Sequence, residues 1–198
     1  MYPKKMVSAS LTIEKSEFIC YLFHCESLED YKESLGIIKK KHYDATHHCS
    51  AFIAPNVQRS SDDGEPSGTA GMPILNVLEK NNLSNTAAIV VRYFGGIKLG
   101  AGGLIRAYGN AVTNAIDMAE LVEDIEINEY ELSLPYDVAN KIDYFLRTAT
   151  TIEDVQYDID VKYVYLTNDD LNDKIQEITK GVSPVFVGTK TKQIPFKK

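Results

Sequence analysis

The sequence predicts an α+β protein made of two domains, and two observations lead to this fold class. Short apolar runs typical of strands alternate with amphipathic helical patterns along all 198 residues, and 44% of the residues are hydrophobic, enough to form buried cores. Near residues 121–128, glycine almost disappears and a second pattern of elements begins. We therefore expect one domain over residues 1–124 and a second over residues 125–198.

The first domain is expected to have the element order β-α-β-α-β-α. Along the chain, its elements are a strand at 16–25, a helix at 27–45, a strand at 47–54, a polar surface loop at 57–71, a helix at 73–81, a buried strand at 86–94 and a helix at 102–120. Ser27 is a suitable N-cap for the first helix. One face of the last helix carries the apolar residues Leu104, Tyr108, Ala111, Ala115 and Met118, and the other face carries Arg106, Asn110 and Asp117.

The second domain is expected to have the order β-α-β-β-α-β, which is the ferredoxin-like arrangement. Its elements are a strand at 129–136, a helix at 137–150, two alternating strands within 153–168, a helix at 169–181 and a strand at 184–196. We expect Asp137 to cap the first helix, Asp158 to lie in the turn between the two strands, and Gly181 to close the second helix. This scaffold alone says little about chemistry.

The formal net charge of −7 argues against a dedicated DNA-binding protein, because phosphate affinity comes from clustered lysine and arginine. Any nucleic-acid site would have to be a local basic patch. Three cysteines, an odd number without a C-x-x-C pair, favour a reducing compartment. The first residues lack the apolar core of a signal peptide, and the longest strongly apolar run, AAIVV, is too short to cross a bilayer. We expect a cytoplasmic protein without membrane association.

An acidic loop, DDGEPSGTAG at 62–71, precedes the helix expected at 73–81. It contains Asp62, Asp63 and Glu65, with Gly64, Pro66, Gly68 and Gly71 shaping the turn. In one interpretation the carboxylates cap the helix and complement its dipole. In the other, the backbone N–H groups from Gly68 through Thr69 to Gly71 form an anion-binding concavity, and the carboxylates position a cation or a proton.

A glycine loop follows the buried strand, where RYFGGIKLGAGGLIRAYG at 92–109 holds six of the twelve glycines. A strand, a glycine-rich loop and a helix start bring backbone N–H groups and the positive end of the helix dipole together, which suits a phosphate. Lys98 and Arg106 add two cations beside it. Neither the Walker A pattern nor G-x-G-x-x-G is present. Alternatively, the glycines permit close packing of helix on strand, and Arg92 pairs with a carboxylate of the acidic loop.

The stretch THHCSA at 46–51 is a third candidate feature. On a strand, His47 and Cys49 face one way and His48 faces the other, so His-x-Cys could supply two metal ligands or a Cys–His nucleophilic pair. No second ligand pair is spaced nearby. We therefore expect these side chains to serve packing or loop-supporting hydrogen bonds, without a metal.

No catalytic residue is assigned from the sequence. The candidate binding residues are His47, His48, Asp62, Asp63, Glu65, Pro66, Gly68, Thr69, Arg92, Tyr93, Phe94, Gly95, Gly96, Lys98, Gly100, Gly102, Gly103 and Arg106.

Three motifs together closely resemble the IMPACT/YigZ family: HHC at 47–49, DDGEPSGTAGMPIL at 62–75 and VVRYFGGIKLGAGGLIRAY at 90–108. The resemblance covers the first domain. It implies a fold shared with a ribosomal small-subunit protein domain, part of elongation factor G and the galactokinase-type kinases, with a left-handed βαβ crossover that departs from the usual rule. The order of elements in the second half is similar to the ferredoxin-like domain of bacterial members, which resembles a domain of elongation factor G. Eukaryotic relatives act on translation by competing for a protein that activates a stress kinase.

Two functions follow as hypotheses. In the first, the chain is a translation-linked binding protein without a cofactor, in which Arg92, Lys98 and Arg106 contact phosphates of RNA, the ribosome or a translation-associated partner, and Tyr93 or Phe94 stacks on a base. In the second, it is an enzyme acting on a phosphorylated or anionic small molecule, with the acidic loop supplying a base or Mg²⁺ ligands. We favour the first, because no complete nucleophile, base and oxyanion constellation is evident. The oligomeric state is left open.

Overall fold

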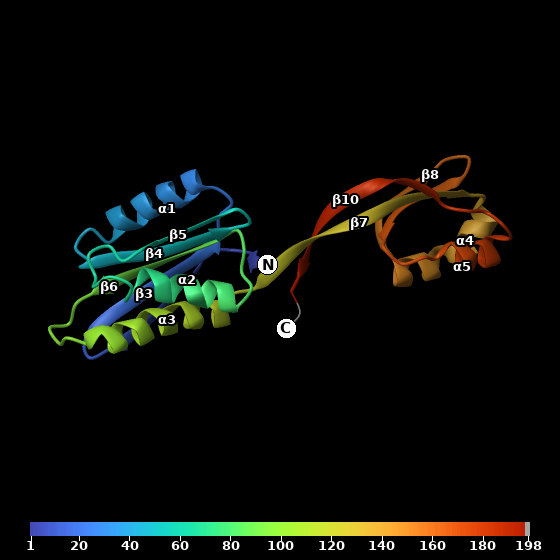
Figure 1. Cartoon of the computed structure of the whole chain (residues 1–198). Helices are drawn as coiled ribbons and strands as arrows, with labels where there is room; N and C mark the ends of the chain where they lie inside the picture. Colours follow the sequence, from blue (N-terminus) through green and yellow to red (C-terminus); the bar gives the residue numbers. More distant parts are fainter. Residues whose placement is uncertain (197–198) are drawn as a thin grey trace. The chain divides into compact units, whose positions relative to one another are not determined.

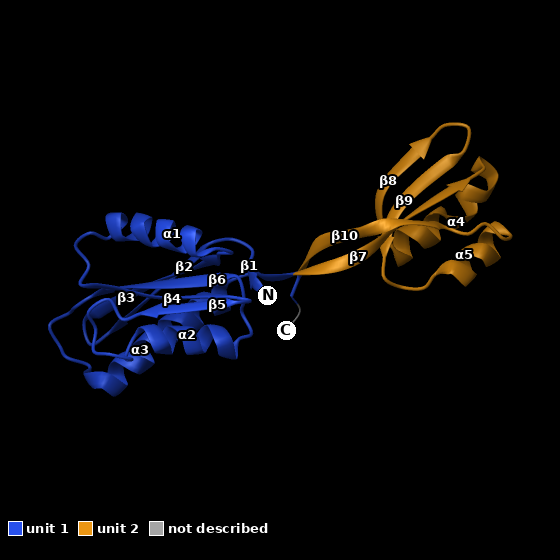
Figure 2. Cartoon of the chain, turned by 45° about the horizontal axis from the view of Figure 1, so that its top comes forward, with its two compact units in different colours: residues 1–123, 195–198 blue, residues 124–194 orange. Residues whose placement is uncertain are grey.

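The computed structural model describes residues 1–196, and the chain divides into two compact units (Figures 1 and 2). Unit 1 contains residues 1–123 together with Pro195 and Phe196, and unit 2 contains Asp124–Ile194. Both units mix helices with a sheet, so the expected α+β class is confirmed. The last strand leads back to unit 1, where the N–H of Phe196 donates to the carbonyl oxygen of Leu121 at 2.9 Å.

Unit 1 is a five-stranded sheet with helices on both faces. Its strands β2 (Val7–Ile13), β3 (Ser16–His24), β4 (His47–Ala54), β5 (Val57–Ser61) and β6 (Thr86–Tyr93) lie in the order β2-β3-β6-β4-β5. Strand β6 is antiparallel to both β3 and β4, so β3 and β4 are parallel to each other and are joined through α1 (Leu28–Lys41). Figure 1 shows α1 on one face of the sheet and α2 (Gly71–Lys80) and α3 (Gly100–Met118) on the other. The two-residue strand β1 (Tyr2–Pro3) pairs with the start of β7 (Leu121–Leu134).

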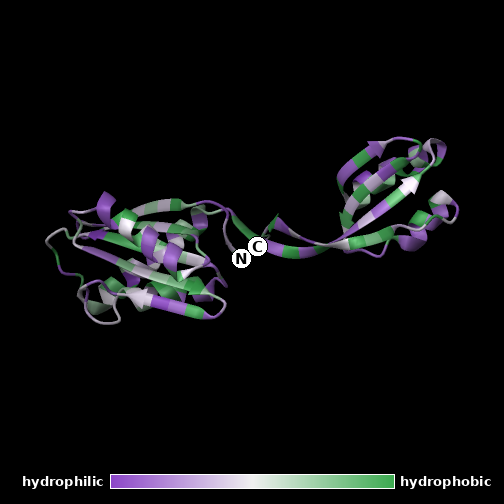
Figure 3. Cartoon of the chain, turned by 90° about the horizontal axis from the view of Figure 1, so that it is seen from above, coloured by the Kyte–Doolittle hydropathy of each residue, from purple (hydrophilic) through white to green (hydrophobic). Residues whose placement is uncertain are grey.

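The central strand β6 is apolar because both of its faces are covered. Ala88 and Val90 pack into the core beneath α2 and α3, whereas Ile89 and Val91 pack into the core beneath α1. A strand buried on both faces shows a continuous apolar run rather than an alternation. Figure 3 shows such hydrophobic segments within the sheet of unit 1.

Unit 2 has the expected order β-α-β-β-α-β. After β7 come α4 (Tyr136–Ala149), β8 (Thr151–Tyr157), β9 (Val161–Thr167), α5 (Asn172–Thr179) and β10 (Val185–Pro195). Strand β7 lies between β10 and β9, and β8 pairs with the other side of β9. The core of this unit contains Leu132, Ile142, Leu146, Tyr163 and Tyr165.

Several local predictions were wrong. Residues 57–61 form the edge strand β5 instead of loop, and four of its five residues are exposed, which hides any strand periodicity. The strand β2 was not predicted. Helix α4 begins after Pro135 without a side-chain cap, so Asp137 lies in its first turn rather than at the N-cap. Met118 is 65% exposed at the end of α3 instead of lying on its buried face.

Other local predictions were confirmed. Ser27 caps α1 by accepting a hydrogen bond from the N–H of Asp30 at 3.1 Å. Helix α5 closes at Lys180, which has left-handed backbone, and at Gly181, whose N–H donates to the carbonyl oxygen of Gln176. Within residues 1–196, none of the helices combines the length and the apolar character that crossing a bilayer requires.

Candidate functional site

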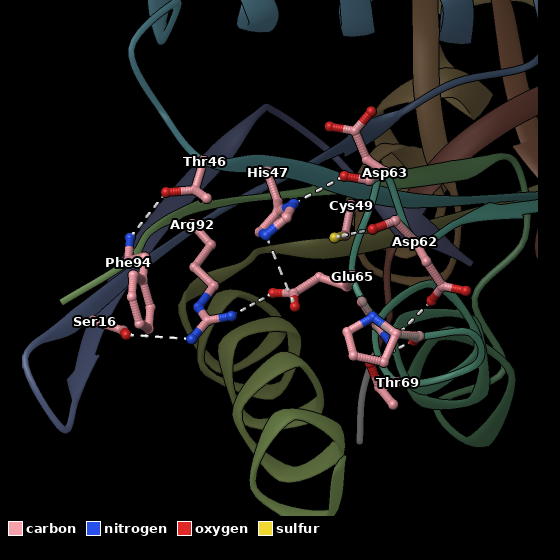
Figure 4. A network of polar contacts seen from close by, with 12 residues as sticks. Ser16, Thr46, His47, Cys49, Asp62, Asp63, Glu65, Thr69, Arg92 and Phe94 are labelled. Atoms are coloured by element: carbon pink, nitrogen blue, oxygen red, sulfur yellow. Dashed lines mark hydrogen bonds and ion pairs between the residues drawn. The ribbon is translucent and has the colours of Figure 1, made fainter. Parts of the chain in front are cut away.

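An ion pair joins the acidic loop to the strand that leads into the glycine loop (Figure 4). Arg92 Nη1 donates to Glu65 Oε1 at 2.6 Å, and the two side chains are only 5% and 4% exposed. The hydroxyl of Tyr108, on α3, donates to the same carboxylate oxygen at 2.7 Å. Burial, together with the neighbouring Cys49 and Glu65, raises the pKa of Tyr108, which keeps its hydroxyl a donor. The predicted alternative in which Arg92 pairs with a loop carboxylate is therefore the arrangement in the structure.

The guanidinium of Arg92 lies between two aromatic rings. Its Cζ atom is 5.3 Å from the ring centroid of Phe18 and 5.4 Å from that of Phe94, both within cation–π range. Nη2 is 3.4 Å from Ser16 Oγ, and Nε is buried without a hydrogen-bond partner among the described residues. Arg92 is thus held inside the fold and is not an exposed phosphate contact.

Asp62 caps helix α2 from within the loop. Its carboxylate accepts hydrogen bonds from the N–H groups of Gly68, Ala70 and Gly71, at 2.8, 3.0 and 2.8 Å. Burial pushes the pKa of Asp62 upward, but the three N–H donors outweigh it and hold the pKa below its usual value. The concavity between Gly68 and Gly71 therefore holds the chain's own carboxylate, as the capping interpretation expects.

Asp63 and Thr69 also serve the loop itself. Asp63 accepts hydrogen bonds from Lys39 Nζ at 2.8 Å and from the N–H of His48 at 2.7 Å. Burial raises the pKa of Asp63, but the contacts with Lys39 and His48 outweigh it and lower the pKa overall. The Thr69 hydroxyl donates to the carbonyl oxygen of Pro66 at 2.7 Å.

The three carboxylates of the acidic loop thus point to three separate sets of partners. Within residues 1–196, no group of three or more histidine, cysteine or acidic side chains is arranged to hold a metal ion. The Mg²⁺ position considered for an enzyme therefore gains no support from this loop.

The three residues of the HHC motif on β4 have different roles. His47 Nδ1 lies 2.9 Å from the carbonyl oxygen of Asp63; since a carbonyl can only accept, Nδ1 carries the proton. Nε2 of His47 lies 3.8 Å from Glu65 Oε2. His48 points to the other face and donates from Nε2 to the carbonyl oxygen of His42 at 2.9 Å. Cys49 is fully buried, and burial raises its pKa to about 12, which excludes a thiolate nucleophile at neutral pH.

The glycines of the glycine loop differ in what requires them, and Gly96 and Gly100 are set apart by left-handed backbone, with φ of 86° and 69°. At Gly95 a Cβ atom would lie 2.0 Å from the carbonyl carbon and oxygen of Lys15, so the close approach of the β2–β3 turn requires glycine there. At Gly102 a Cβ would meet only Arg106 Nη1, at 3.8 Å, and the residue is exposed in the first turn of α3. Packing therefore explains Gly95, but it does not explain Gly102.

The cations of the glycine loop are exposed. Lys98 and Arg106 line a groove of about 590 Å³ between the glycine loop and the β2–β3 turn, where Glu14 also lines it, and neither cation forms an ion pair within residues 1–196. Phe94 is 45% exposed. Tyr93 faces the side of α1, where its hydroxyl lies 2.8 Å from His42 Nδ1. The structure therefore separates Tyr93 from the exposed group of Phe94, Lys98 and Arg106.

A cleft of about 400 Å³ opens where the two loops meet. His47, Glu65 and Arg92 provide its polar lining, and Phe94, Lys98 and the start of α3 border it. Four further lining residues, Thr46, Leu99, Ala101 and Leu104, were not among the candidates from sequence. Leu99 lies inside the glycine run, which is a usable signal, but Leu104 was interpreted only as a core residue of the helix.

Comparisons with known proteins cover both loops. The family model of the Impact N-terminal domain matches residues 14–116. IMPACT family member YvyE of Bacillus subtilis is 40% identical over 189 residues, which span 91% of this chain and 87% of the relative. IMPACT family member YigZ of Escherichia coli is 39% identical over 141 residues, 69% of each chain. A solved structure titled as that of a hypothetical protein aligns with a TM-score of 0.58 at 30% identity, covering 100% of this chain and 97% of the other.

Proposed function

The chain belongs to the IMPACT family, and from that premise we propose that it is a translation-linked binding protein that contacts RNA of the ribosome through its glycine loop. The observation that carries this proposal is the pair of exposed cations, Lys98 and Arg106, at the start of α3. Both lack a carboxylate partner within the described residues although the chain has a net charge of −7. The N-cap residue Leu99 makes no side-chain hydrogen bond, so the first N–H groups of α3 add to the positive potential there.

Two lysines of unit 2 illustrate the contrast with a paired cation. On the sheet of unit 2, Lys162 pairs with Glu131 at 2.8 Å, and Lys190 pairs with Glu129. A cation that is already paired gains less binding free energy from contact with a phosphate, because its existing carboxylate partner must first be displaced. Lys98 and Arg106 carry no such penalty, which favours the glycine loop as the phosphate contact.

The acidic loop, which would be expected to repel RNA, is neutralised internally. Glu65 is paired with Arg92, Asp63 is paired with Lys39, and Asp62 accepts three backbone N–H groups. Phe94 remains exposed beside the cations and offers a surface on which an unpaired base can stack. The proposed contact therefore consists of Phe94, Lys98, Arg106 and the first turn of α3.

Sedimentation of native lysate through a sucrose gradient tests this proposal. We compare wild type with the double variant Lys98→Glu, Arg106→Glu, and follow the protein across the ribosomal fractions at two salt concentrations. We expect salt-sensitive co-migration of wild type and its loss in the variant. Removing two phosphate contacts should also lower the salt slope of binding to single-stranded RNA by about 1.4, from about 0.7 per contact.

The matched control is the double variant Lys5→Glu, Lys32→Glu, which changes the net charge equally at two exposed positions. Lys5 lies just before the first residue of β2, whereas the glycine loop lies near the last residue of β2. Lys32 is on α1, which covers the opposite face of the sheet from α3. This control should still co-migrate. Wild type confined to the light fractions at both salt concentrations would contradict the proposal, and so would equal loss in both variants, which would indicate a general charge effect.

A further inference from the structure

We infer that the cleft of about 400 Å³ between the two loops binds one nucleotide, either free or at the end of an RNA chain, with its base inside and its phosphate at the mouth. This inference deepens the proposed function, since the glycine loop would form one wall of the cleft. The two sites share Phe94, Lys98 and the start of α3. The proposed RNA contact also uses Arg106, which does not line the cleft, whereas the inference rests on the inner groups Glu65, His47 and Arg92.

The inner end of the cleft presents two hydrogen-bond acceptors side by side. Arg92 and Tyr108 both donate to Glu65 Oε1, which leaves Oε2 with His47 Nε2 at 3.8 Å, beyond hydrogen-bond distance. Nδ1 of His47 carries a proton because it donates to a carbonyl oxygen, so in the neutral form of the ring Nε2 is an acceptor as well. Two neighbouring acceptors without a donor between them are suited to an amino group of a ligand.

Buried Arg92 also has unused hydrogen-bonding capacity. It lines the cleft with a side chain that is 5% exposed, and its Nε has no partner among the described residues. Figure 4 shows the guanidinium between Phe94 and Glu65, two side chains that border the cleft. Most buried polar groups of folded proteins have a partner, so a buried donor without one, beside two free acceptors, indicates a site that a ligand completes.

The walls of the cleft suit a flat, largely apolar ring. Phe94, Pro66 and Leu104 contribute apolar surface, and Phe94 is positioned to stack. The volume falls within the range of about 300–1,000 Å³ that is usual for small-molecule sites. A nucleobase with its ribose fits these dimensions and this mixture of apolar walls with a few convergent polar groups.

Charge sets the direction in which the ligand enters. At the inner end, Arg92 and Glu65 neutralise each other, so a charged phosphate gains little there. At the mouth, Lys98 and the start of α3 at Gly100 are positive. The anionic end of the ligand therefore belongs at the mouth and its uncharged ring inside.

Isothermal titration with GMP, AMP, CMP, UMP and inorganic phosphate tests the inference on the full chain. The first three bases carry an exocyclic amino group that can donate to Glu65 Oε2 and His47 Nε2, whereas uracil carries none. We expect at least one amino-bearing nucleotide to bind, with UMP at least tenfold weaker and phosphate weaker still.

Three results would contradict this expectation. Equal binding of UMP would overturn the base-inside orientation, and absence of binding of every nucleotide at millimolar concentration would overturn the site. Phosphate binding as tightly as the nucleotides would reduce it to an anion site.

Two pairs of variants locate the ligand. Phe94→Ala should weaken nucleotide binding at least fivefold, whereas Tyr43→Ala, which removes an aromatic ring that is 84% exposed, should leave it unchanged. Lys98→Ala should weaken binding of GMP more than binding of guanosine, and Lys32→Ala on α1 should affect neither. Equal effects within either pair would contradict the assignment of the cleft.

The source of the nucleotide is settled by competition. A linear hexanucleotide with a 5′-phosphate and its circularised form are compared for displacement by the mononucleotide. Displacement of the linear form alone identifies the end of an RNA chain as the ligand, and displacement of neither identifies a free nucleotide. His47→Ala, which changes only the cleft, should lose mononucleotide binding and keep ribosomal co-migration, and Arg106→Glu, which lies outside the cleft, should do the reverse, so the inference and the proposed function can each fail alone.

Discussion

The acidic loop and the glycine loop of unit 1 differ in where their polar groups are directed. In the acidic loop every carboxylate has partners inside the chain: Asp62 accepts three N–H groups, Asp63 pairs with Lys39, and Glu65 pairs with Arg92. In the glycine loop Lys98 and Arg106 have no ion pair within residues 1–196 and face the solvent. The loop whose charged groups are all paired is the structural one, and the loop with two unpaired cations has the groups free to bind.

The charge of a loop is therefore a weaker indicator of function than the hydrogen-bonding state of its groups. Buried polar groups that are satisfied internally stabilise the fold, and groups without partners are available to a ligand. The cleft lies where the two kinds of group meet, since Glu65 is shared: one oxygen is held by Arg92 and Tyr108, and the other lies free beside His47. Substitutions in each loop should consequently separate stability from binding.

The largest effect on stability is expected for Arg92→Met. This change leaves the carboxylate of Glu65, only 4% exposed, without its cation. Removing one partner of a buried ion pair typically costs about 3 to 5 kcal/mol of the unfolding free energy. Urea unfolding of the full chain, followed by circular dichroism at 222 nm, measures the change.

The double variant Arg92→Met, Glu65→Gln serves as its control. It removes both charges and leaves an amide oxygen to accept from Tyr108, so it should recover most of the lost unfolding free energy. A single variant that costs less than about 1 kcal/mol, the range of an exposed pair, would mean that the two loops are not held together by this contact.

A smaller effect is expected for Asp62→Ala. The N–H groups of Gly68, Ala70 and Gly71 would lose their acceptor, which should lower the unfolding free energy by about 2 to 3 kcal/mol. Asp62→Asn keeps one acceptor oxygen and should cost about 1 kcal/mol. Hydrogen exchange at these three amides gives a local measurement, because their protection should fall in the alanine variant while that of α5 is unchanged.

The same residue predicts a pH dependence. The folded-state pKa of Asp62 is below its unfolded value, so its stabilisation is present above the ordinary aspartate pKa of about 4 and is lost as the pH falls through the lower, folded value. The difference in unfolding free energy between wild type and Asp62→Asn should therefore be largest above pH 5 and shrink in acid. A difference that is constant with pH would show that the charge of Asp62 does not contribute.

Much of the fold could be predicted because its strands and helices carry strong periodic patterns. The buried run of β6 and the helical spacing of α3 are local signals, and both elements lie within two residues of their predicted bounds. The edge strand β5 could not be found, since its exposed residues on an outer strand need no alternation. The pairing order, in which β6 inserts between β3 and β4, depends on contacts distant in sequence and leaves no local pattern.

The candidate site was predicted as a set of residues, but their individual roles were not. Three separate motifs supplied His47, Glu65 and Arg92 as candidate binding residues, and the structure places the three around one cleft. Sequence could not show that Asp62 fills the concavity of its own loop, or that Tyr93 faces α1 while Phe94 is exposed. Those roles depend on backbone direction within a turn, which residue type alone does not determine.

The smallest change, Gly102→Ala, sharpens the contrast within the glycine loop because it should improve stability while reducing binding. Gly102 lies in the first turn of α3, its Cβ would meet only Arg106 Nη1 at 3.8 Å, and alanine should raise the unfolding free energy by about 0.4 to 1 kcal/mol. The added methyl group lies on the surface proposed to contact RNA, so ribosomal co-migration should fall.

Gly95→Ala, in the same loop, should instead destabilise unit 1, because its Cβ would overlap the backbone of Lys15. A Gly102→Ala protein that is more stable and still co-migrates fully would show that this glycine is not a contact and would confine the proposed RNA surface to the side chains of Phe94, Lys98 and Arg106.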